Sequence, residues 1–142
     1  MDAPDFFRDV VKPNYDRFLD DQNQLRRLWN AVVSMNTVAE YVALDRLRYK
    51  QVAREQLDQK AKEIRRDNQV LLELKDCAET LKHVRKLAGK VGTEVTSVPS
   101  STGILSNQPT TWVIDYQLRQ YVLSDVLRRA FYTLSTFSEF NQ

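Results

Sequence analysis

The chain has 142 residues, of which 42% are hydrophobic and 28% charged, and a formal net charge of +2. This length suits one domain with a core of its own, and the apolar fraction is too high for a disordered chain. The small net charge gives no argument for nucleic-acid binding. Cys77 is the only cysteine, which excludes an intramolecular disulfide and a cysteine-rich zinc site.

The sequence predicts a cytoplasmic protein that does not bind membranes. Its first residues lack the basic stretch and the apolar run of a secretion signal. No run of about 18 apolar residues predicts a membrane-spanning helix. A single free thiol fits a reducing compartment.

Glycine and proline divide the chain into regions. Neither occurs from Asn14 to Ala88, whereas the next stretch holds all three glycines and two of the four prolines: Gly89, Gly92, Pro99, Gly103 and Pro109. Both residue types interrupt regular structure. We therefore expect one mainly α domain over 1–142: a bundle of about four to five helices, with a small antiparallel β insertion before the last helix. Helices are expected over 1–88, the loop or β-hairpin insertion over 89–123, and the C-terminal helix over 124–138.

The first helix is expected from about Pro4 to Leu19. Pro13 should kink or divide it, because proline cannot donate the i→i−4 hydrogen bond. The pair Asp20-Asp21 can cap a second helix that runs to about Arg48. Apolar residues recur along the second helix every three or four positions, which is the spacing of an amphipathic helix: Leu25, Leu28, Trp29, Val32, Met35, Ala39, Val42 and Ala43.

Two further helices are expected over 51–67 and 69–88, the latter ending at a Gly89 cap. β-Branched residues predict strands over 93–98 and 111–114, and a third over 120–123 that could instead begin the last helix. Ser124 is a credible cap for that helix. Its apolar stripe comprises Val126, Leu127, Ala130, Phe131, Leu134 and Phe137.

His83 is the only histidine and the first candidate for chemistry. On the expected fourth helix it follows Glu79 by four residues, close enough to pair, and a carboxylate favours the charged imidazole. Lys82, Arg85 and Lys86 lie beside it. One interpretation makes His83 a general acid or base on an anionic substrate such as RNA, with the three cations binding phosphate. The other makes it an exposed residue paired with Glu79.

Other polar residues suggest structural roles. Arg85 is expected near the apolar face of its helix, where it either extends to solvent or pairs with Glu40 or Asp45. Cys77 should behave as a small hydrophobe. No metal site is predicted, because one histidine and one cysteine leave only carboxylates to complete a ligand shell. No cofactor is predicted either.

Polar residues also interrupt the apolar pattern of the second helix: Asn30, Ser34, Asn36, Thr37 and Glu40. Buried polar groups need partners. These residues could form an internal network that fixes the helix register, or line the ligand pocket of a small-molecule sensor.

Leu72 and Leu87 are candidate interface residues. On the expected fourth helix they lie opposite the main apolar stripe, which indicates a second packed surface. That surface could be internal to the bundle, or it could contact another protein or a second copy of the chain in a homodimer.

The segment from Leu74 to Lys86, with the sequence LKDCAETLKHVRK, resembles the late-helix segment of small bacterial HEPN-like helical bundles. Many of these carry a Lys-His pair after an apolar helical turn. The resemblance covers this helix and the general helical plan. Nuclease members use an arginine followed four to six residues later by a histidine, here His83, but no arginine lies between Asp67 and Lys82.

The resemblance therefore implies a non-catalytic binding or scaffolding member, in a bacterial stress, toxin–antitoxin or phage-defence setting. We predict a protein-interaction or oligomerisation module rather than an enzyme. Two alternatives stay open at this point. One is a HEPN-like ribonuclease or RNA-binding protein centred on His83, and the other is a small-molecule sensor.

Overall fold

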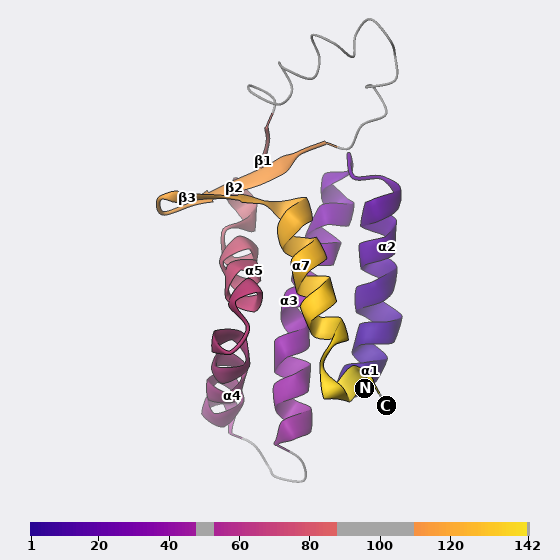
Figure 1. The fold of residues 1–142 in the computed structure, drawn as a ribbon, viewed down its shortest axis with the longest axis vertical. Helices are drawn as coiled ribbons and strands as arrows, with labels where there is room; N and C mark the ends of the chain where they lie inside the picture. The colour runs from indigo at the N-terminus through magenta and orange to yellow at the C-terminus, as the bar shows by residue number, and fades with distance from the viewer. Residues whose placement is uncertain (48–52, 88–109, 142) are drawn as a thin grey trace, which may run out of the picture.

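A computed structural model describes residues 1–47, 53–87 and 110–141. In chain order the elements are α1 (Ala3–Phe6), a π-helical turn (Phe7–Val11), α2 (Lys12–Asp20), α3 (Leu25–Arg46), α4 (Arg54–Arg66), α5 (Gln69–Glu79), a 3-10 turn (Leu81–His83), β1 (Arg85–Lys86), β2 (Trp112–Tyr116), β3 (Arg119–Val122), α7 (Leu123–Ser135) and a 3-10 turn (Ser138–Phe140). The fold is mainly α with a three-stranded antiparallel sheet before the last long helix (Figure 1). The expected fold class is confirmed.

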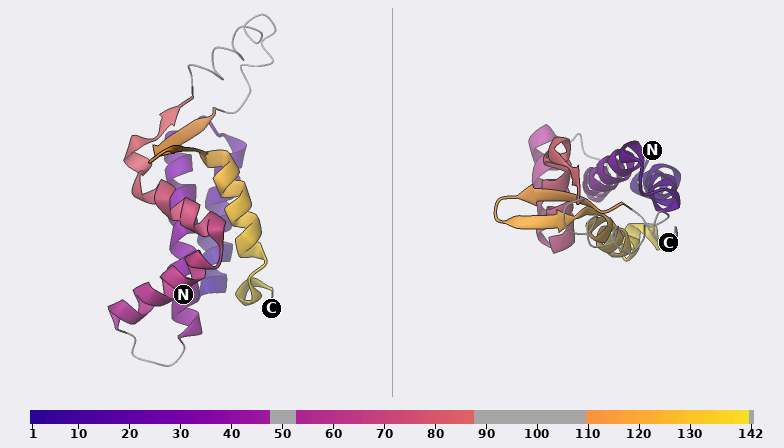
Figure 2. Two further views of the ribbon diagram at one scale, coloured as in Figure 1. Left: turned by 60° about the vertical axis from the view of Figure 1, so that its left-hand side comes forward. Right: turned by 90° about the horizontal axis from the view of Figure 1, so that it is seen from above.

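Helix α3 is the centre of the bundle. It contacts α2, α4, α5 and α7. In Figure 1 it runs behind α7, with α4 and α5 on one side and α2 on the other. The sheet lies across one end of the helices, and the views in Figure 2 show it projecting beyond α5 and α7. None of the described helices is long and apolar enough to cross a membrane.

The N-terminal segment is helical from Ala3 to Asp20, close to the expected range. Asp2 caps its start by accepting a hydrogen bond from the Asp5 amide at 2.9 Å. The expected irregularity at Pro13 takes the form of the π-helical turn directly before it. Because Pro13 has no amide hydrogen, the regular series of i→i−4 hydrogen bonds cannot continue through it. The wider π-helical turn accommodates this missing hydrogen bond.

Helix α3 spans nearly the expected range but begins without the expected cap. Its N-cap residue is Gln24, which makes no side-chain cap bond. Asp21 instead accepts from the Asn23 amide at 3.1 Å, in the turn before the helix. An aspartate that bonds a backbone amide two residues ahead stabilises a turn rather than a helix start.

The expected helix over 69–88 ends at Glu79, which corrects its C-terminal boundary. The Thr80 hydroxyl donates to the Asp76 carbonyl at 2.7 Å, and the chain then turns through Leu81–His83. Arg85 and Lys86 pair as a strand with β2, opposite Val113 and Trp112. Pairing with a segment far along the sequence overrides the local helix propensity here.

The sheet has the order β1-β2-β3, and both pairings are antiparallel. The expected strands over 111–114 and 120–123 are confirmed by β2 and β3, whereas the expected strand over 93–98 lies outside the described residues. Trp112 fixes the sheet to the bundle, because its indole N–H donates to the Gln22 carbonyl at 2.6 Å. Helix α7 begins at Leu123, one residue before the expected cap Ser124.

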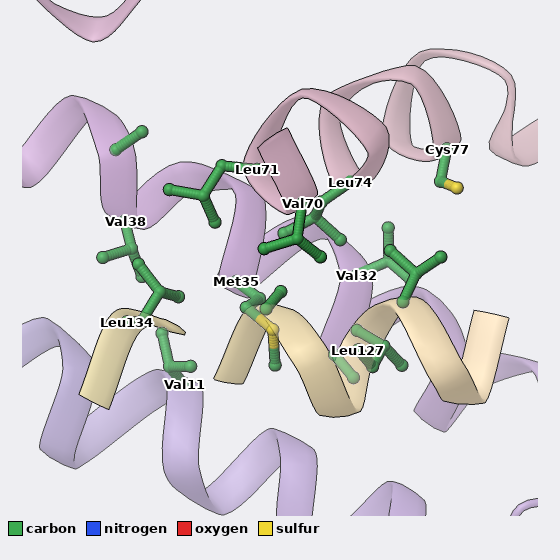
Figure 3. Close-up of a cluster of buried hydrophobic side chains, with 14 of the residues drawn as sticks. Val11, Val32, Met35, Val38, Val70, Leu71, Leu74, Cys77, Leu127 and Leu134 are labelled. Atoms are coloured by element: carbon green, nitrogen blue, oxygen red, sulfur yellow. The ribbon is translucent and has the colours of Figure 1, made fainter. Parts of the chain in front are cut away.

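The core lies between α3, α5 and α7 and extends to the N-terminal helical segment (Figure 3). Met35 and Val32 of α3 face Leu74 of α5 and Leu127 of α7, and Val11 lies near Leu134 at one end. All six side chains are almost fully buried. Each such side chain stabilises the fold by about 1.5–3 kcal/mol relative to exposure, so the bundle rests on this central contact.

Candidate functional site

His83 and its basic neighbours lie in a turn and a short strand rather than on a helix. Lys82 and His83 are exposed in the 3-10 turn. Glu79, the expected partner of His83, instead forms an ion pair with Lys75, with Nζ and Oε1 3.5 Å apart. The pairing rested on helical spacing, and that spacing is lost because α5 ends at Glu79.

Arg85 pairs with neither of its expected partners. Its Nη2 and Nε atoms donate to Oδ2 of Asp115 at 2.8 and 3.2 Å, across the β1–β2 pair. This hydrogen bond lowers the pKa of the Asp115 carboxyl. Asp45 instead accepts from the Ala3 amide at 3.0 Å. An ion pair was the correct kind of contact, but its partner comes from the sheet.

Two of the three candidate RNA-binding cations are therefore engaged within the protein. Arg85 is held by Asp115, and the ammonium of Lys86 lies 5.4 Å from the ring centroid of Trp112. Both side chains remain exposed, so such contacts are weak. Lys82 is the candidate cation for which no such contact is found within the described ranges.

The candidate interface residues Leu72 and Leu87 are both half-buried. Leu72 lies on α5, as expected. Leu87 follows β1, where its amide donates to the Thr111 carbonyl at 2.8 Å and extends the sheet pairing. The two residues therefore do not share a helix face, because the helix that would have aligned them ends before Leu87.

Cys77 is buried in the core, and burial raises the pKa of its thiol to about 12. The thiolate is the nucleophilic form, so Cys77 is unreactive near neutral pH. No group of three or more metal-ligating side chains occurs within residues 1–47, 53–87 and 110–141.

Helices α5 and α7 are joined by an ion pair that the sequence analysis did not identify. Glu73 has a side chain only 8% exposed, and the Arg129 guanidinium donates to both of its oxygens, at 3.1 and 3.2 Å. The Arg129 Nε also donates to Asp125 at 2.9 Å. These hydrogen bonds raise the pKa of Arg129. We call Glu73, Asp125 and Arg129 the α5–α7 seam.

A cavity of about 340 Å³ lies beside this seam. Its walls come from the start of α5 and the outer side of α7, including Arg128, Arg129 and Tyr132. Arg128 donates to Asp125 at 2.7 Å, and Arg129 is held by the seam. Because nearby carboxylates neutralise both guanidinium groups, the cavity gives little basis for an anion-binding site.

The polar residues of α3 do not form one network. Ser34 and Thr37 donate to carbonyls of their own helix, those of Asn30 and Val33, at 2.6 and 2.8 Å. Such bonds satisfy the hydroxyls locally. Asn36 instead makes a contact between helices, through its carbonyl oxygen and side chain.

That contact is with Arg65, a buried arginine on α4. Its Nη2 donates to the Asn36 carbonyl at 3.0 Å and approaches the Asn36 Oδ1 at 3.4 Å. Its Nε finds no hydrogen-bond partner in the described part of the chain. Burial lowers the pKa of Arg65, against the attraction of Glu40, Glu79 and Asp58. Arg65 thus holds α4 against α3 with one donor unsatisfied.

The remaining side of α3 leaves large apolar side chains in contact with solvent. The exposed fractions are 42% for Leu25, 39% for Trp29, 49% for Val33 and 47% for Leu44. At about 100° per residue these positions fall within one third of the helix circumference. Leu25 and Trp29 were expected on the core stripe, but they lie at its edge. Val33 and Leu44 were not identified from the sequence.

Two charged residues of opposite sign lie on the same side, Arg26 toward the start of α3 and Glu40 toward its end. Neither forms an ion pair with any described residue, although many other charged residues of the bundle do. We call Leu25, Arg26, Trp29, Val33, Glu40 and Leu44 the outer face of α3. Exposed apolar residues grouped on one helix face are typical of a contact surface.

No protein-family model, curated protein or solved structure gives a significant match to the chain.

Proposed function

We propose that the chain is a non-catalytic protein that acts by binding another protein or a second copy of itself, and that the outer face of α3 makes the contact. The observation that carries this proposal is the row formed by Leu25, Trp29, Val33 and Leu44. These side chains are 39–49% exposed on the helix that contacts most of the bundle.

The chemistry of this row suits association. Removing apolar surface from water favours association. Tryptophan is enriched among the residues that dominate binding energy, especially at the centre of an interface. Trp29 lies between Leu25 and Val33, one helical turn from each. Because α3 is held on its other sides by four helices, the row is presented on a rigid support.

RNA binding through Lys82, Arg85 and Lys86 is less well supported. Arg85 and Lys86 already make contacts with Asp115 and Trp112, although weak ones. Three cations and one histidine are also few for a nucleic-acid site, because affinity grows with the number of phosphates that are neutralised. A bacterial setting and HEPN-like membership rest on the sequence resemblance alone.

The Val33→Glu substitution tests the proposal by placing a charge in the middle of the row. The tagged chain would be mixed with an untagged copy of itself and with a lysate of its source cells, and bound proteins would be quantified by mass spectrometry. We expect the substitution to remove a specifically bound protein, either the untagged copy or another chain, because a buried unpaired carboxylate disfavours the complex.

The matched control is Leu118→Glu, at a fully exposed leucine in the β2–β3 turn. It adds the same charge far from α3 and should leave the bound proteins unchanged. Circular dichroism of both variants checks that the fold is intact. If the folded Val33→Glu variant captures the same proteins in the same amounts as the unaltered chain, the proposed function is wrong.

A further inference from the structure

The outer face of α3 has a charge pattern that is complementary to itself. Arg26 and Glu40 each lie seven residues from Val33, one on either side along the helix. Seven residues are close to two full turns, so both charges fall within about 20° of the direction of Val33. The rise of the helix places each of them about 10.5 Å from Val33 along the axis.

We infer that the partner of this face is a second copy of the chain, bound with the two α3 helices antiparallel and a two-fold axis beside Val33. This inference rests on the proposed function and names the partner of that same face. In this arrangement Val33 faces Val33 of the second copy. Arg26 faces Glu40 of the second copy, and by symmetry Glu40 faces Arg26.

The positions between these residues fill the two edges of the contact. Trp29 lies about 40° to one side of the direction of Val33, and Thr37 lies about 40° to the other side. The two-fold axis therefore places the indole of one copy at the same height as the smaller Thr37 of the second copy, at the opposite edge. A two-fold contact requires this kind of self-complementarity, because one patch must fit itself.

The charges also determine the direction of the helices. In a parallel pair Arg26 would face Arg26 and Glu40 would face Glu40, and like charges directly across a helix interface are unfavourable. In the antiparallel pair both contacts join opposite charges. Neither residue has an ion-pair partner among the described residues, so pairing across the dimer requires breaking no ion pair seen within one chain. Glu40 also attracts the buried Arg65 of its own chain, without forming an ion pair with it.

The size of the surface limits the affinity. One helix face buries less area than the roughly 1,600 Å² of a standard stable interface. We therefore expect a weak, reversible homodimer. Sedimentation equilibrium should show the mass rising from 16.6 kDa toward twice that value as the protein concentration increases.

Trp29 supplies a second measurement of the same equilibrium. The other tryptophan, Trp112, is only 5% exposed, so a shift of the emission to shorter wavelength on concentration reports the burial of Trp29. The two measurements should give the same dissociation constant.

Charge reversal tests the antiparallel register directly. The R26E variant presents two carboxylates to its own copy at each end of the contact, and the E40R variant presents two guanidinium groups. Each variant alone should therefore remain monomeric over concentrations at which the unaltered chain dimerises. An equimolar mixture of the two should form a heterodimer, because both ends then join opposite charges, and the R26E/E40R double variant should again form a homodimer.

Arg26 is exposed and Glu40 half-buried, so urea unfolding of the dilute variants is used to confirm that their folds are stable. Failure of the unaltered chain to self-associate overturns the inference. So does failure of the mixture to associate when its components are folded. Neither result affects the proposed function, which stands if Val33→Glu still removes a different bound protein.

Discussion

The α5–α7 seam and the outer face of α3 both place charged residues beside apolar ones, but only the seam pairs its charges within the chain. Glu73 is buried and receives two hydrogen bonds from Arg129, and Asp125 holds the same guanidinium from the other side. On the outer face, Arg26 and Glu40 have no such partner among the described residues. A buried charge without a partner is very unfavourable, whereas an exposed one is tolerated in solvent.

This difference separates residues that maintain the fold from residues available for binding. Changes at the seam should lower the free energy of unfolding and leave association unaffected in the molecules that remain folded. Changes on the outer face should weaken association and leave the free energy of unfolding nearly unchanged. The predictions below test this separation, in order of the size of their effect on the free energy of unfolding.

The largest effect is expected for Arg129→Ala. Among the described residues, the substitution leaves the buried Glu73 carboxylate with Arg119 as its one ion-pair partner, at 4.0 Å. Breaking a buried ion pair from one side lowers the free energy of unfolding by about 3 kcal/mol or more. Urea denaturation followed by circular dichroism measures the change.

Arg128→Ala is the matched control for that experiment. Arg128 is the next residue on α7 and also bonds Asp125, but its side chain is 69% exposed. An exposed ion pair contributes at most about 1 kcal/mol. Equal losses for the two variants would show that the seam is no more important to the fold than a surface contact.

The seam also shows what sequence reasoning could not reach. Glu73 and Arg129 lie on separate helices and are brought together by the fold. Nothing in the local pattern of either helix identifies the other. The partner of Arg85 could not be identified from local sequence either. An ion pair was one of the two contacts expected for it, but Asp115 comes within reach only when β1 pairs with β2.

The spacing of apolar residues along the chain correctly predicted the elements that bury one face against the core. The extents of α3 and α7 and the presence of β2 and β3 were expected from apolar spacing and β-branched residues. The same reasoning placed Leu25 and Trp29 in the core. Steps of four residues turn by about 400°, so a row spaced by four moves some 40° per step and leaves the buried side. Periodicity does not show where a face ends, because the neighbouring helices determine that.

An intermediate effect, dependent on pH, is expected for Cys77, which lies on α5 near the seam. Its thiol pKa is about 12 in the folded protein, against 9.0 for an ordinary thiol. The folded state therefore keeps its proton at a pH where the unfolded state loses it. The stability that this supplies is fully present below pH 9 and is lost as the pH rises through about 12.

Between pH 8 and pH 10 the loss from Cys77 amounts to about 1.4 kcal/mol, the equivalent of one pKa unit. The Cys77→Ala variant has no thiol and so does not show this loss. Between pH 8 and pH 10 the difference in unfolding free energy between the unaltered chain and the variant should therefore narrow by about 1.4 kcal/mol. Urea denaturation at both pH values measures the change. Tyr15 and Tyr121 also have raised pKa values, but they are common to both proteins and cancel in the comparison. An unchanged difference would show that the thiol is not protected in the folded state.

The smallest effect is expected for Val33→Thr on α3, and the sharpest contrast comes from the same substitution at the adjacent Val32. Val32 is fully buried and Val33 is 49% exposed. Threonine has nearly the shape of valine but introduces a hydroxyl, which lowers the free energy of unfolding by about 1–3 kcal/mol where it must be buried. Val32→Thr should show that loss, whereas Val33→Thr should stay within about 0.5 kcal/mol, as exposed substitutions do.

Dimer formation should be weakened more by Val33→Thr than by Val32→Thr. Val33→Thr places a hydroxyl at the centre of the inferred contact and should weaken dimer formation in sedimentation equilibrium. Val32→Thr changes a side chain that the contact does not reach, so its folded molecules should dimerise as the unaltered chain does. If both variants lost stability equally and associated equally, the two sides of α3 would not have separate roles. An exposed apolar residue adjacent to a buried one would then be only the edge of the core.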